Sequence, residues 1–222
     1  MRLSLTGLAA MLAPLLALGS CAGEETDGPV QAYLTDIATF EGNTPGGSVF
    51  TVRMMDDSPL ATLRADRSVD CGRKPPVRMM IRYQPQNGRP YTDSDIRLSH
   101  ASPVNSEPPV TDPATASRLL AFFGRDPAEP VSVWRTGEYI NIRMRLMECA
   151  EARTLALVLV PETARTAEPE YRLVHALPAG APPSYMRTAY ASYDISYVWS
   201  DPSTRLVKIS LNPGETFTFR RQ

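Results

Sequence analysis

The fold class of this chain is set by one stretch, Tyr139-Ile140-Asn141-Ile142-Arg143-Met144-Arg145-Leu146. Apolar and polar side chains alternate along it. Because successive residues of a strand point to opposite faces, this alternation predicts a β-strand with one buried face and one wet face. We interpret residues 134–146 as a central strand of a β-sandwich, with Trp134 packed near its start.

The rest of the second half repeats this period of two. Leu155, Leu157 and Leu159 resume the alternation after a polar interval, which indicates a hairpin. Four more strands are expected at residues 173–177, 188–197, 206–211 and 216–219. Six or seven strands without helices between them are typical of an antiparallel sandwich.

The first half contains five shorter strand candidates. The clearest is Val77-Arg78-Met79-Met80-Ile81-Arg82-Tyr83, whose odd-numbered members share a face, and Asn87-Gly88 is a strong turn signal after it. The other four lie at residues 30–40, 49–55, 60–63 and 96–99. Five short strands predict a small closed or half-closed barrel.

A proline-rich stretch separates the two halves. Residues 102–109 carry three prolines and no apolar periodicity. Asp112-Pro113 then starts a short helix that we expect to end at Gly124, because Asp is a favoured N-cap, Pro a favoured first residue and Gly a favoured C-cap. We therefore expect an all-β chain, with an N-terminal barrel over residues 30–105 and a C-terminal β-sandwich over residues 106–222.

The first residues have the pattern of a lipoprotein signal peptide. Arg2 supplies a positive charge, and residues 3–18 form an apolar segment shorter than the ~20 residues of a membrane-spanning helix. The segment ends in Leu18-Gly19-Ser20-Cys21, which has the form of a lipobox. We expect residues 1–20 to be removed and Cys21 to carry covalent lipid. The alternative is a plain secreted protein with a cysteine near the cleavage site.

Residues 21–29 are polar and acidic, and we expect them to form a flexible tether. Two or more acyl chains hold a protein durably on a membrane. No Asp follows Cys21, so retention in the inner membrane is not signalled. We expect a lipid-anchored outer-membrane protein, on either the periplasmic face or the cell surface.

The formal net charge of the chain is −1 at pH 7. A nucleic-acid binder would show a basic stripe and a strongly positive charge. The balance of charges therefore argues against a nucleic-acid partner.

Two cysteines besides Cys21 are present, Cys71 and Cys149. The oxidising cell envelope would permit a disulfide between them. The alternative is two unpaired cysteines, each packed as a small hydrophobic residue. Without a C-x-x-C pair or a cluster of histidines we expect no metal site, and no cofactor beyond the lipid.

Catalytic motifs are missing from the sequence. It has no glycine-rich phosphate loop, no H-E-x-x-H and no G-x-S-x-G. His175 shares the face of its apolar neighbours and is expected to be a core or interface histidine, whereas His100 is expected to face solvent. Asp56 and Asp57 are expected in a solvated turn. We predict that the protein is not an enzyme.

Five aromatic residues gather near the C-terminus: Tyr185, Tyr190, Tyr193, Tyr197 and Trp199. Exposed Tyr and Trp anchor interfaces and can stack on sugar rings. Their numbering splits them between the two faces of a strand, so some should pack in the core. The others leave a ligand platform open as an alternative.

Several segments resemble one known family. They are the lipobox, residues 30–39, residues 50–57, the stretch 126–142 with its Pro-Val start, Trp134, Gly137 and Tyr139, and, more loosely, residues 172–175 and 188–196. This pattern is similar to that of the NigD-like lipoproteins of Gram-negative gut and oral bacteria. The resemblance implies an OB-like barrel followed by a β-sandwich. The family is named for its association with a bacteriocin locus, an immunity role has been proposed for it, and it has no established catalytic residues.

Two functional hypotheses follow. The first is a non-catalytic envelope lipoprotein that binds a protein or peptide partner, with bacteriocin immunity as one such role. The second is a surface glycan-binding module that uses the exposed aromatic residues.

Overall fold

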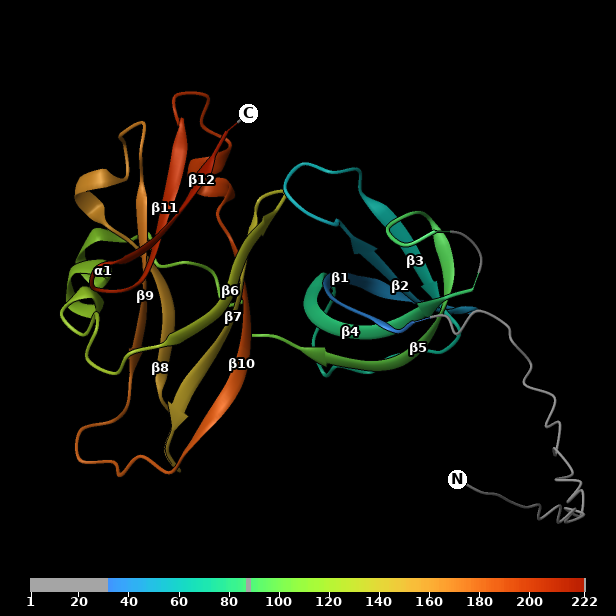
Figure 1. Ribbon diagram of the computed structural model, residues 1–222, viewed down its shortest axis with the longest axis horizontal. Coiled ribbons are helices and arrows are strands. Elements are labelled where there is room, and N and C mark those ends of the chain that lie inside the picture. Colours follow the sequence, from blue (N-terminus) through green and yellow to red (C-terminus); the bar gives the residue numbers. More distant parts are fainter. Residues whose placement is uncertain (1–31, 87–88, 222) are drawn as a thin grey trace, which may run out of the picture. The chain divides into compact units, whose positions relative to one another are not determined.

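The computed structural model describes residues 32–86 and 89–221 (Figure 1). Strands dominate it and form a closed barrel followed by two further sheets, which confirms the all-β prediction. Cys21, the signal peptide over residues 1–20, the tether over residues 21–29 and the Asn87-Gly88 turn lie outside the described residues. Within the described part, no helix combines the length and the apolar character needed to cross a membrane.

Five strands close the N-terminal barrel: β1 (Leu34–Thr44), β2 (Gly47–Val52), β3 (Ala61–Ala65), β4 (Val77–Pro85) and β5 (Ser94–Pro103). Their order is β1-β2-β3-β5-β4, and β1 pairs with both β2 and β4, so the sheet has no free edge. β3 and β5 run parallel while the other pairs are antiparallel. This is the OB-like barrel that was expected.

The barrel core follows the parity of its longest buried strand. Val77, Met79, Ile81 and Tyr83 of β4 are all buried, as their alternation predicted. The β1–β2 turn requires Gly47, which has a φ of 126° and whose added Cβ would lie 2.1 Å from the carbonyl oxygen of Ala65. A glycine there lets the turn pass directly over β3.

Seven strands follow: β6 (Glu129–Thr136), β7 (Tyr139–Glu148), β8 (Thr154–Leu159), β9 (Glu170–Ala176), β10 (Tyr185–Asp194), β11 (Leu206–Asn212) and β12 (Glu215–Arg220). They form a three-stranded sheet, β10-β7-β6, and a four-stranded sheet, β12-β11-β9-β8. The short helical elements of this half are α1 (Pro113–Leu120), the 3-10 turn η1 (Pro161–Thr163) and α2 (Ser196–Trp199).

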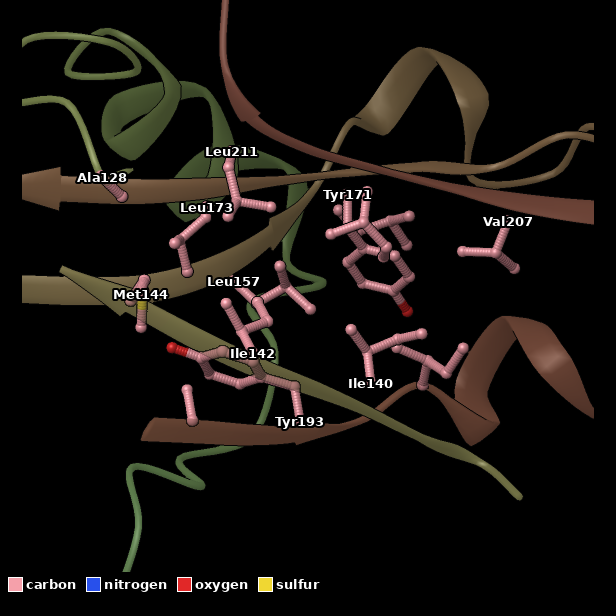
Figure 2. Packing of buried hydrophobic residues seen from close by; sticks show 14 of the residues in the cluster. Ala128, Ile140, Ile142, Met144, Leu157, Tyr171, Leu173, Tyr193, Val207 and Leu211 are labelled. Carbon is pink, nitrogen blue, oxygen red and sulfur yellow. The ribbon is translucent and has the colours of Figure 1, made fainter. Parts of the chain in front are cut away.

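The core of this half lies between the two sheets (Figure 2). Ile140, Ile142, Met144 and Leu146 of β7 have no exposed surface, which confirms the predicted buried face. Leu157, Tyr171 and Leu173 from the four-stranded sheet belong to the same cluster. β7 is the central strand of its sheet, since β10 and β6 pair with its two edges.

Three details of the predicted strands are corrected. Trp134 lies on β6, because the chain reverses at Gly137, which has a φ of 59°, before β7 begins. The strand expected at residues 188–197 begins at Tyr185, ends at Asp194 and is followed by α2. The sandwich is not purely antiparallel, since β9 and β11 run parallel.

The segment between the barrel and α1 is paired rather than free. The amide of Asn105 donates to the carbonyl of Tyr190, and the amide of Ser192 donates to the carbonyl of Asn105. Val110 pairs in the same way with β8, and Val104 is buried, although this stretch has no apolar periodicity. The division into domains at residues 105 and 106 stays a prediction.

Helix α1 begins as expected. The carboxylate of Asp112 accepts a hydrogen bond from the amide of Thr115 at 2.9 Å, and Pro113 occupies the first turn. The helix ends at Leu120, before Gly124. Gly124 instead takes a φ of 77° in the turns that follow the helix.

Candidate binding site beside the β2–β3 loop

A cleft of about 700 Å³ lies between the outer face of β1 and β2 and the turn that joins β6 to β7. Side chains of both signs and two aromatic rings line it. Its lining comprises Thr39, Glu41, Thr51, Val52, Arg53, Asp57, Leu60, Pro76, Arg78, Thr136, Gly137, Glu138, Tyr139, Trp199, Ser200 and Arg221.

The β2–β3 loop, residues 53–60, is attached to the β6–β7 turn through its backbone. The amide of Asp56 donates to the carbonyl of Arg135 at 2.8 Å, and the amide of Gly137 donates to the carbonyl of Asp56 at 2.6 Å. Asp56 has a φ of 43°, a left-handed conformation that is uncommon for a residue other than glycine. These bonds fix the loop at the rim of the cleft.

Arg135 secures the loop through its side chain. Its guanidinium donates to both carboxylate oxygens of Asp57, at 2.8 and 2.7 Å, and lies 4.3 Å from the centre of the Trp199 ring. A carboxylate oxygen of Asp56 lies 3.5 Å from the same group. Charge-assisted bidentate pairs of this kind are among the stronger hydrogen bonds. The hydrogen bonds from Arg135 lower the pKa of Asp57.

Arg78 forms the second buried cation, on β4. Its guanidinium donates to Ser192 at 2.8 Å, to Asn141 at 3.1 Å, and to Thr39 at 2.8 Å, and it lies 4.2 Å from the centre of the Tyr139 ring. Burial lowers the pKa of Arg78 to about 10, which still leaves it charged at neutral pH. No carboxylate of the described residues lies within ion-pair distance of it.

The cleft also contains charged side chains that form no ion pair within the described residues. Arg53 donates to the carbonyl of Ser58, and Arg221 donates to the carbonyl of Asp201 at 2.7 Å. Neither forms an ion pair with a carboxylate among the described residues. Glu138 accepts a hydrogen bond from Ser200 rather than from a cation.

Three large apolar side chains of the same loop are exposed. Met54, Met55 and Leu60 expose 49%, 53% and 54% of their surface. Leu60 lines the cleft, and all three lie within the loop that Arg135 holds. Exposed apolar side chains gathered on one segment are typical of an interaction surface.

The five aromatic residues expected as core or platform do not form one surface. Tyr193 is fully buried in the sandwich core and Trp199 is nearly so, because they face the second sheet. Tyr190 is half-buried. Tyr185 and Tyr197 are exposed, but they lie at opposite ends of β10.

The described residues include two cysteines, Cys71 and Cys149, and two histidines, His100 and His175. Cys71 and Cys149 are both free, so the expected alternative of a disulfide is wrong; Cys71 packs beside the barrel core, and the sulfur of Cys149 contacts the carbonyl of Glu151. His175 is buried with Nδ1 3.0 Å from the carbonyl of Asp126, and burial lowers its pKa. His100 is exposed, as expected.

Over residues 32–86 and 89–221, no group of three or more potential metal ligands comes together. Asp56 and Asp57, expected in a solvated turn, do lie in a turn but share Arg135. The sequence analysis missed Arg78, Arg135 and Asn141. Arg78 and Asn141 alternate with apolar neighbours on their strands, a pattern that predicts an outward side chain, and contact between the barrel and the three-stranded sheet buries them. Arg135 instead pairs with Ile140 and lies on the core face of β6, where the Trp199 ring covers it.

No protein-family model matches the sequence, and no curated protein matches it. Solved structures, in contrast, do match the fold of this chain. The chain has the fold of a NigD-like immunity protein from Bacteroides caccae, at a TM-score of 0.56 and 16% identity, over 83% of this chain and 90% of that chain. The NigD-like resemblance seen in the sequence is thus supported by the structure.

Two further structures share this architecture. A protein of unknown function, DUF1344, from Bacteroides vulgatus matches 86% of this chain and 90% of its own with a TM-score of 0.62 and 16% identity. A putative toxin-related protein from Parabacteroides distasonis matches 86% of this chain and 92% of its own with a TM-score of 0.63 and 11% identity. At such identities the likeness shows a common fold, and none of these descriptions names an enzyme.

Proposed function

We propose that this NigD-like chain is a non-catalytic binding protein that holds a protein or peptide partner at the cleft and the β2–β3 loop. The observation that carries the proposal is the exposure of Met54, Met55 and Leu60 on a loop that is already fixed in place. Interfaces are anchored by a few apolar or aromatic side chains, and a preorganised loop loses little entropy on binding.

The chemistry of the cleft suits a peptide. Its volume of about 700 Å³ falls within the usual range for ligand sites. Arg53 and Arg221 can donate to carbonyl or carboxylate oxygens, while Glu41 and Glu138 can accept from amides or a cationic side chain. Thioether side chains adapt to differently shaped partners, which favours a protein surface over a single small molecule.

The fold neighbours support a role in defence against bacterial toxins. One is described as a NigD-like immunity protein and another as a putative toxin-related protein. We propose that the partner is a bacteriocin or another envelope-active protein, which the chain sequesters. Anchoring by lipid on Cys21 in the outer membrane, at the periplasmic face or the cell surface, would place the cleft where such a partner passes.

The test uses a strain that carries this gene, its deletion mutant and a panel of bacteriocin preparations applied to both. The deletion is complemented with wild type, with a Met55→Ser/Leu60→Ser double variant, or with Val131→Ser. Val131 is a matched control, because it exposes 49% of its surface on β6 and does not line the cleft.

Wild type and Val131→Ser should restore resistance, and the double variant should not, at equal protein levels. Full protection by the double variant would show that the loop does not bind the partner. A deletion strain that is no more sensitive than its parent would remove the immunity role.

A further inference from the structure

A second cavity, of about 390 Å³, lies on the side of Arg78 and Tyr139 where β10 ends. The segment before α1, the end of β10 and α2 enclose it. Prolines and hydroxyl-bearing residues line it, and the latter are Ser106, Thr111, Tyr139, Tyr171, Ser192, Ser196 and Tyr197. The cavity shares no residue with the β2–β3 loop.

Tyr171 gives the cavity a buried polar group without a partner. The side chain is fully buried, and its hydroxyl makes no hydrogen bond within the described residues. Burial, together with the charge of Asp194, raises the pKa of Tyr171, so the hydroxyl stays neutral and is both a donor and an acceptor. Leaving such a group unbonded is costly, and native proteins rarely do so without a reason.

The mouth of the cavity combines an aromatic ring with a carboxylate. Tyr197 exposes 67% of its surface. One carboxylate oxygen of Asp194 accepts a hydrogen bond from the amide of Ser196 at 2.8 Å. The other has no hydrogen-bond partner within the described residues and is available to a ligand.

We propose that this cavity binds one saccharide unit of a glycan. A sugar ring presents hydroxyls that both donate and accept, which matches Asp194, the hydroxyl of Tyr171 and the hydroxyls of Ser106 and Ser196. It also presents an apolar C–H face, which matches the exposed ring of Tyr197 and the proline side chains of the lining. A cavity of this volume is at the small end of ligand sites and accommodates one or two sugar rings rather than a folded partner.

The partnerless hydroxyl allows a clean test. Tyr171→Phe removes only an oxygen that forms no hydrogen bond within the described residues, so the melting temperature should stay the same or rise. If a sugar hydroxyl normally bonds there, the same change should weaken binding. Tyr193→Phe is the matched control, because its hydroxyl is also buried and without a partner but does not line this cavity. In Figure 2 the two hydroxyls point to different parts of the core, that of Tyr193 toward Met144.

A second pair of variants tests the aromatic ring. Tyr197→Ala removes the exposed ring at the cavity, and Tyr185→Ala removes a ring that exposes 58% of its surface at the other end of β10. All variants are made in the lipid-free chain that starts after Cys21. The probes are the neutral disaccharides cellobiose, maltose, lactose and chitobiose, with saturation-transfer NMR to detect binding and calorimetric titration to measure it.

At least one probe should bind wild type, Tyr193→Phe and Tyr185→Ala alike, and bind Tyr171→Phe and Tyr197→Ala about tenfold more weakly or not at all. If no probe binds wild type, or all four variants bind as wild type does, the saccharide site is overturned. Met55→Ser/Leu60→Ser should leave saccharide binding unchanged, so this proposal and the peptide-binding role can fail separately.

Discussion

The guanidinium of Arg78 on β4 lies 3.1 Å from the side-chain oxygen of Asn141 on β7 and joins the barrel to the three-stranded sheet. Asn141 is completely buried, although its place in the alternation predicted a wet side chain. Its amide also donates to Thr136 at 2.8 Å, and its oxygen accepts from Ser192 at 2.8 Å. A buried cation is thus held by neutral acceptors, which must all be present to offset its loss of hydration.

Asn141→Ala should therefore lower the free energy of unfolding by about 2–3 kcal/mol, because it leaves Arg78, Ser192 and Thr136 without their common partner. Urea denaturation measures the change. Thr218→Ala, at an exposed position of β12, is the control and should change the stability by less than about 0.5 kcal/mol. Equal effects of the two substitutions would contradict the role given to Asn141.

Ile142→Asp should unfold the second half of the chain. The side chain has no exposed surface in the sandwich core, and an unpaired carboxylate there has no compensating partner. Arg143→Ala, the next residue and exposed, should cost less than about 0.5 kcal/mol. Thermal melts of both variants decide this, and two small and equal shifts would mean that β7 does not carry the core.

Asp57→Asn should lower the free energy of opening of the β2–β3 loop by about 1 kcal/mol or less. The effect is small because more than half of the Asp57 side chain is in contact with solvent, which screens its ion pair with Arg135. The folded state has the lower pKa, so the stabilisation from the carboxylate is complete above the unfolded-state pKa and is lost as the pH falls through the folded-state value. The difference between wild type and variant should thus be constant near neutral pH and should shrink below about pH 4. Hydrogen exchange of the loop amides over this range measures it, and a difference that grew on acidification would have the wrong sign.

Gly47→Ala should destabilise the barrel by about 1–3 kcal/mol, since it combines a left-handed φ with a clash against the backbone of Ala65. Gly46→Ala is the neighbouring control, because its added Cβ would meet only the Thr44 hydroxyl, at 3.9 Å. Denaturant midpoints compare the two. A barrel that tolerates both equally would show that the turn does not need a glycine at position 47.

Cys21→Ser should abolish attachment to the membrane, because serine has no thiol to carry the diacylglyceryl group. Fractionation of cells that express wild type or variant measures this, with Cys71→Ser as a control that should stay in the membrane fraction. A Cys21→Ser variant that still sediments with the outer membrane would refute the lipoprotein interpretation.

The sequence determines more about the two hydrophobic cores than about the candidate sites. The period-two alternation of Ile140 to Leu146 and of Val77 to Tyr83 was enough to place both buried faces, since a strand with one apolar face has one way to bury it. Asp112-Pro113 fixed the start of α1 for a similarly local reason. The resemblance to NigD-like lipoproteins added the OB-like topology, which alternation alone does not specify.

The candidate sites were decided by tertiary structure. Arg78 and Asn141 have the spacing of solvent-facing residues, and they are buried only because the outer faces of two sheets meet at them. The lack of a hydrogen-bond partner for the Tyr171 hydroxyl within the described residues likewise cannot be predicted from the sequence of β9. Local periodicity records which face of a strand is apolar, whereas contacts between segments far apart in sequence determine which polar groups lose water and where a cleft opens.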